Sequence, residues 1–101
     1  MGLSTKVIAD GSEYIIAVTG MFDFNVLTEF KESYKEIPEG VTSIAVDLRQ
    51  VDYMDSSALG MLLNMKKKLE ENIEEFKILN ANNEVLKVLT ISRFDKMFSI
   101  Q

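Results

Sequence analysis

The hydrophobic pattern of this chain switches repeatedly between the period of strands and the period of helices, and this limits the folds that the sequence can adopt. The sequence pattern predicts strands at residues 3–9, 13–19, 42–48, 76–80 and 97–100. Segments with apolar residues at helical spacing predict helices, at residues 24–35, 57–70 and 82–91. The predicted order is β-β-α-β-α-β-α-β, which places the chain in the α/β class.

The connections between these segments predict how the strands pair. Asp10 and Gly11 form a hairpin signal between the first two strands, so this pair is expected to be antiparallel. Each later strand follows a helix, and right-handed crossovers of this kind give parallel pairs. In segment 42–48 one face is apolar and the other is mixed. We therefore expect a small, mixed, mostly parallel sheet with an antiparallel N-terminal edge strand and helices mainly on one face.

The length and composition fit a single domain over residues 1–101, with 47% apolar residues available for a core. The sequence contains no cysteine and no histidine. This excludes disulfides, thiol catalysis, Cys-ligated zinc and a Ser-His-Asp triad. The five glycines are isolated from one another, so no phosphate-cradling glycine loop is present. We expect the chain not to be an enzyme and to hold no cofactor.

The charge balance bears on the class of partner. Eleven Lys and Arg stand against 16 Asp and Glu, which gives a net charge of −5. Nucleic acid and anionic membranes need a basic footprint, so neither is expected as a partner. No apolar run reaches the roughly 18 residues of a membrane span, and the expected location is the cytoplasm. The lysines at 66–68 are followed at once by glutamates, which favours a solvated face whose charges pair with each other.

Four aspartates are expected near the carboxyl ends of the parallel strands, where α/β sheets bind ligands. They are Asp23, Asp47, Asp52 and Asp55. Such carboxylates are the only plausible metal ligands of this chain. The favoured interpretation is that they are loop and cap residues rather than a metal site.

The sharpest motif, Met54-Asp55-Ser56-Ser57-Ala58-Leu59-Gly60, leads into the second predicted helix. Asp and Ser oxygens accept hydrogen bonds from the first unpaired N–H groups of a helix, so one interpretation is a simple cap. The other interpretation is functional, because hydroxyls at the positive end of a helix dipole stand where a phosphate is well accommodated. The spacing alone leaves both open.

The motif resembles the Asp-Ser-Ser-Gly-Leu-Gly signature of STAS domains, in particular of bacterial anti-sigma factor antagonists. The likeness extends along nearly the whole chain. Thr19-Gly20-Met21-Phe22-Asp23 looks like the Gly-x-x-Asp that follows the second strand in the family, and Val46-Asp47-Leu48 and segment 76–80 fall where its later strands lie. The predicted order of elements also matches the family fold.

The resemblance implies a phosphorylation switch. In the family the second serine of the pair, here Ser57, is phosphorylated by a partner that is both an anti-sigma factor and a serine kinase. The unmodified form binds this kinase and frees the sigma factor, whereas the phosphorylated form lets go until a serine phosphatase resets it. The expected partner-binding residues are Asp23, Asp55, Ser56, Ser57, Ala58 and Met61. The chain itself is expected to be a monomer or a weak dimer.

Two of these residues carry further interpretations. Ala58 replaces the usual glycine of the family. Alanine is favoured over glycine in a helix interior by about 0.8–1.0 kcal/mol, so the start of the helix should be stiffer. This difference bears on kinase recognition. Met61 shares its helix with several apolar residues, so core packing is favoured over partner contact. The alternative function is a STAS scaffold or small-ligand-binding subunit of a transporter or signalling assembly, in which the serines are only helix caps.

Overall fold

The structure is a computed structural model and describes residues 2–101. Its strands are β1 (Leu3–Ile8), β2 (Glu13–Phe22), β3 (Ser43–Met54), β4 (Glu75–Leu79) and β5 (Ser99–Ile100). Its α-helices are α1 (Leu27–Ser33), α2 (Ser56–Leu69) and α3 (Asn83–Ile91). A short 3-10 turn, η1 (Phe24–Val26), precedes α1, and another, η2 (Phe94–Lys96), follows α3. The predicted order of strands and helices is confirmed.

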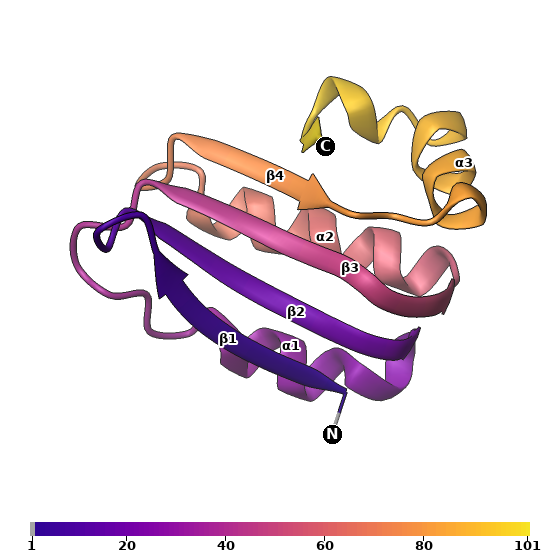
Figure 1. The fold of residues 1–101 in the computed structure, drawn as a ribbon, viewed down its shortest axis with the longest axis horizontal. Coiled ribbons are helices and arrows are strands. Elements are labelled where there is room, and N and C mark those ends of the chain that lie inside the picture. Colours follow the sequence, from indigo (N-terminus) through magenta and orange to yellow (C-terminus); the bar gives the residue numbers. More distant parts are fainter. Residues whose placement is uncertain (1) are drawn as a thin grey trace.

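The strands form one sheet whose spatial order, β1-β2-β3-β4-β5, is the order of the chain. β1 and β2 pair antiparallel, and the other neighbouring strands pair parallel. Because each right-handed crossover steps in the same direction across the sheet, the connecting helices fall on the same face. Figure 1 shows α1 and α2 on that face, with α1 near β1 and β2, α2 behind β3 and β4, and α3 beyond the carboxyl end of β4. The predicted fold class is confirmed.

The main core lies between this face of the sheet and the helices. The side chains that are no more than 1% exposed in β2, β3, α1 and α2 include Ile16, Val18, Phe30, Ile44, Val46, Leu48, Leu62 and Met65. The opposite face carries polar groups, among them an ion pair between Glu13 of β2 and Lys77 of β4 with an N–O distance of 3.1 Å. The core is thus one-sided, as the pattern of segment 42–48 predicted.

β3 is longer than the sequence indicated, since it continues from the predicted end at residue 48 to Met54. Between Ala17 and Met21 of β2 the register shifts twice, each time with one more residue on β3 than on β2. Each extra residue of such a bulge changes the face to which the following side chains point. Leu48, Val51 and Met54 are therefore all buried although they are three residues apart. Because this spacing does not have the two-residue period of a regular strand, the sequence pattern did not indicate the second half of β3.

Candidate functional site

The carboxyl ends of β2 and β3 lie side by side and position the predicted site. Phe22, the last residue of β2, pairs with Met54, the last residue of β3. The backbone N–H of Asp55 donates to the carbonyl oxygen of Phe22 over 3.4 Å. Asp23 and Asp55 therefore leave the sheet from neighbouring positions, the first into η1 and the second into α2. The fold brings together two of the acidic residues expected at the site.

Asp55 caps the N-terminus of α2 and holds the Ser57 hydroxyl. Its Oδ1 accepts the backbone N–H of Ser57 at 3.0 Å and the Ser57 hydroxyl at 2.6 Å. The hydroxyl bond, helped by bonds from backbone N–H groups, keeps the pKa of Asp55 below its ordinary value against the opposing effect of desolvation. The carboxylate is therefore ionised at neutral pH. Ser57 is partly exposed and Ser56 is exposed.

Asp23 has a comparable role at the start of η1, where its Oδ1 accepts the N–H of Asn25 at 2.9 Å. The cap interpretation of Asp23 and Asp55 is confirmed. Asp47, by contrast, accepts the N–H of Arg49 at 3.0 Å beside the first bulge of β3. Within residues 2–101, no group of three or more His, Cys, Asp or Glu side chains is arranged to hold a metal ion.

The structure corrects the expected partner surface at two positions. The side chain of Ala58 is 0% exposed and that of Met61 is 4% exposed, and both belong to the hydrophobic core. They lie on the side of α2 that packs on the sheet, because the first turn of α2 directs Ser56 outward and Ala58 inward. Their assignment to the partner surface was wrong, whereas the core interpretation of Met61 is confirmed.

Three exposed apolar side chains near the serines were missed by the sequence analysis. Met21, Phe24 and Tyr53 are 55%, 68% and 51% exposed. We call these three residues the apolar rim. Met21 and Tyr53 are paired neighbours on β2 and β3, and Phe24 begins η1 directly after Asp23. Met21 and Tyr53 thus form an exposed apolar pair, and exposed large apolar side chains of this kind can mark surfaces that bind other proteins. The predicted strand ended at residue 48, so the pairing of Met21 with Tyr53 was not foreseen.

Comparison with known proteins places this chain in a family. The family described as "Mlab, STAS domain" matches residues 6–100, and the chain belongs to this family of STAS domains. A STAS-domain containing protein of Pseudomonas aeruginosa (strain UCBPP-PA14) is 36% identical over 100 residues, which cover 99% of each chain. An anti-sigma-B factor antagonist of Staphylococcus aureus (strain NCTC 8325) is 28% identical over 93 residues, which cover 91% of this chain and 86% of that protein.

Solved structures share the architecture. An anti-sigma factor antagonist from Mycobacterium paratuberculosis superposes with a TM-score of 0.77 at 18% identity, over 97% of this chain and 84% of the other. A sulfate transporter family protein from Wolinella succinogenes gives a TM-score of 0.76 at 21% identity, over 91% of this chain and 75% of the other. Similarity at these identities shows the fold alone.

Among the helices of residues 2–101, none is both long enough and apolar enough to cross a bilayer.

Proposed function

We propose that this chain is an anti-sigma factor antagonist that is switched by phosphorylation of Ser57. In its unmodified form it binds an anti-sigma factor that is also a serine kinase, and a sigma factor is freed. Phosphorylation ends this binding, and a serine phosphatase restores it. The chain then acts as a single-domain substrate and binding module in the cytoplasm, without catalytic activity of its own. Its similarity to an anti-sigma-B factor antagonist supports the class of function.

The observation that carries the proposal is the position of the Ser57 hydroxyl. It lies in the first turn of α2, is partly exposed, and donates to the Asp55 carboxylate over 2.6 Å. Phosphorylation would replace this donor by a group with about −1.5 to −2 charges. Together with ionised Asp55, the charge at one point of the surface would rise to about −2.5 to −3. A partner that docks here would have to desolvate that charge.

The fold itself should tolerate the phosphate. Ser57 stands at the positive end of the α2 dipole, which favours an anion. The adjacent core residues, Met54 and Ala58, point away into the apolar interior and need not move. The effect of phosphorylation would therefore fall on the docked partner. Like-charge contact across an interface costs several kcal/mol, which is enough to end binding.

The apolar rim supplies the attractive part of the same surface. Met21 and Tyr53 directly precede the core residues Phe22 and Met54, so their side chains lie on the face of the sheet away from α2, and a partner that contacts them and the α2 N-terminus would reach around the carboxyl ends of β2 and β3. Burial of their apolar area would stabilise the complex at roughly 25 cal/mol per Å². We therefore propose a partner surface formed by the rim together with Asp23, Asp55, Ser56 and Ser57. The apolar rim would contribute to the affinity for the partner, and phosphorylation of Ser57 would regulate the binding.

The test is to recover the full-length chain from its own cells under several growth conditions and to map its phosphates by mass spectrometry. We expect a fraction of molecules with one phosphate, on Ser57. The matched control is Ser56→Ala, which removes an exposed hydroxyl that has no side-chain hydrogen bond within the described residues. That variant should keep the phosphate, and Ser57→Ala should lose it. Absence of phosphate from Ser57 under every condition would contradict the switch and favour the scaffold alternative.

A further inference from the structure

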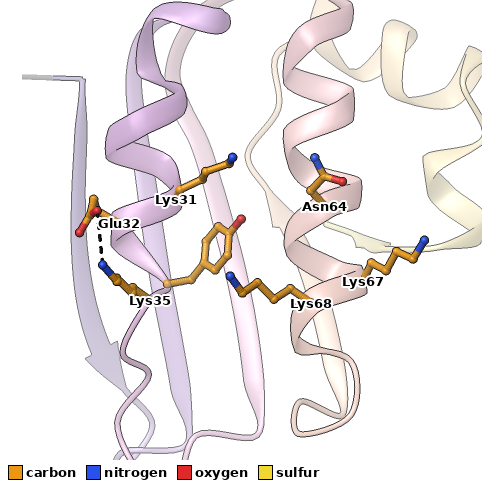
Figure 2. Close-up of a pocket in the computed structure, with 7 residues that line it drawn as sticks. Lys31, Glu32, Lys35, Asn64, Lys67 and Lys68 are labelled. Atoms are coloured by element: carbon orange, nitrogen blue, oxygen red, sulfur yellow. Dashed lines mark ion pairs between the residues drawn. The ribbon is translucent and has the colours of Figure 1, made fainter.

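A cavity lies at the opposite end of α2 from the serines, between the C-terminal turns of α1 and α2 (Figure 2). Its volume is about 520 Å³, within the range of small-ligand sites. Along the helix it is about 16 Å from Ser57, at 1.5 Å per residue. We call it the lysine groove, and its lining residues are Lys31, Glu32, Tyr34, Lys35, Asn64, Lys67 and Lys68.

The groove is positive in a chain of net charge −5. Its four lysines and one glutamate give a formal charge of +3. Lysines in the last turn of a helix ordinarily balance the helix dipole, and each C-terminus carries about half a negative charge. α1 and α2 are both crossover helices between parallel strands, so their two C-termini meet at this groove. About two positive charges remain after both dipoles are counted.

Pairing within the chain does not remove this charge. The glutamates after residues 66–68 were expected to neutralise the lysines, but the structure shows this for Lys66 alone, whose Nζ lies 3.4 Å from Glu70. Within residues 2–101, Lys31, Lys67 and Lys68 form no ion pair of 4.0 Å or less. The expectation of a self-paired face was therefore wrong for the two lysines that line the groove from α2.

The side chains converge from both helices. Figure 2 shows Lys31 of α1 and Lys68 of α2 extending into the space between the two helices from opposite sides and at different levels, with Asn64 on the α2 side, whereas Lys67 points away from α1. Lys35 instead turns to Glu32, at an N–O distance of 3.9 Å. Lys31 and Lys68 are both exposed, so water screens the repulsion between their ammonium groups, and an anion bound between them would reduce it further.

Tyr34 adds a neutral donor to the wall of the groove. Its ring is buried beside Phe30, with ring centroids 5.7 Å apart. Burial raises the pKa of the Tyr34 hydroxyl, which therefore keeps its proton at neutral pH. A protonated phenol can donate a hydrogen bond to an anion in the groove, as can the amide of Asn64.

We propose that the lysine groove binds a compact, multiply charged phosphate anion, held between Lys31 and Lys68 with Asn64 as a further donor. The positive charge that remains after the helix dipoles are counted favours an anion of this class. The volume admits an anion of two or three phosphate groups without rearrangement of either helix. This inference does not depend on phosphorylation of Ser57.

The experiment is a titration of the ¹⁵N-labelled full-length chain with pyrophosphate, followed by NMR at constant ionic strength. We expect saturable shifts of the amides of residues 31–35 and 64–68, with residues 55–58 unchanged. Lys31→Gln and Lys68→Gln should each weaken binding about tenfold, the loss expected for one charge-assisted hydrogen bond. The control Lys6→Gln removes an exposed lysine from β1 and should change the affinity less than twofold.

Three outcomes would overturn the proposal. The first is the absence of saturation by pyrophosphate, or equal shifts with sodium chloride alone. The second is a loss of affinity in Lys6→Gln as large as that in Lys68→Gln, which would show binding to net charge rather than to a site. The third is binding to vesicles of phosphatidic acid without binding to free pyrophosphate, which would assign the phosphate chemistry to a lipid surface.

Discussion

The two ends of α2 treat charge in opposite ways. At the N-terminus Asp55 accepts two hydrogen bonds from Ser57, and its negative carboxylate stabilises the positive end of the helix that it caps. At the C-terminus Lys67 and Lys68 line a groove and form no ion pair within the described residues. Both ends present charges of the sign that stabilises a helix dipole. They differ because the Asp55 carboxylate is hydrogen-bonded within the chain, whereas the positive charge of the lysines exceeds the negative charge of the helix C-termini.

This difference indicates how each end can be controlled. A site whose polar groups already satisfy one another responds to a covalent change, since a phosphate on Ser57 removes the donor that Asp55 uses. A site with an excess of positive charge, such as the lysine groove, can instead bind an anion from solution. One helix can therefore carry a covalent switch at one end and a ligand site at the other.

The largest expected effect concerns partner binding at the two ends. Ser57→Asp should lower the affinity for the proposed anti-sigma factor kinase about a hundredfold, because several kcal/mol of like-charge repulsion would enter the interface. Ser57→Ala should retain the affinity of the unmodified chain. Lys68→Gln, at the far end of α2, should change it less than twofold. Calorimetric titration of each variant with the purified kinase measures this, and equal binding by the alanine and aspartate variants would refute the switch.

A second effect concerns the backbone beside the acidic end. Gly20 lies in β2 next to the second bulge with φ +84°, and an added Cβ would meet no atom within 4 Å. Gly20→Ala should therefore destabilise the fold by about 1–2 kcal/mol through backbone strain alone. The matched control is Gly60→Ala in α2, where the added Cβ is also unhindered and should stabilise by about 0.8–1.0 kcal/mol. Urea unfolding measures both, and changes of the same sign would contradict this account.

The smallest effect is a change in the pKa of Asp55. Because the Ser57 hydroxyl is the main cause of the lowered pKa, Ser57→Ala should raise it toward its ordinary value, whereas Ser56→Ala should leave it unchanged. A lowered pKa in the folded state contributes stability above the unfolded-state pKa, and this contribution is lost as the pH falls through the folded-state pKa. Ser57→Ala should therefore weaken the acid dependence of stability. A titration followed by the carboxyl ¹³C shift of Asp55 measures its pKa in each variant. Identical pKa values in Ser57→Ala and Ser56→Ala would contradict the prediction.

The sequence predicted the architecture well because its main signals are local. The hairpin at Asp10 and Gly11 and the strand–helix alternation fix the antiparallel edge and the parallel remainder of the sheet. The end of β3 could not be predicted in this way. Its two bulges depend on pairing with β2, a partner more than twenty residues away, and they shift the inward positions to a spacing of three. The same shift hid the exposed side chain of Tyr53.

The candidate site was predicted only where a motif carries it. Asp55 and Ser57 are neighbours in sequence and interact locally, so the motif sufficed to identify them. Ala58 and Met61 were misassigned because the family signature marks a segment and does not say which side of the helix packs on the sheet. The lysine groove was not predicted, because the lysines at 66–68 were interpreted as a self-paired face and the groove arises only when residues about thirty or more positions apart meet across two helices.

The agreement between the spatial order of the strands and their order along the chain has a consequence for biosynthesis. Each strand leaving the ribosome finds its pairing partner already synthesised, and no later segment has to insert between two earlier ones. We therefore expect the sheet to assemble progressively during translation, beginning from the β1–β2 hairpin. The C-terminal elements α3 and β5 would complete it last, at the outer edge.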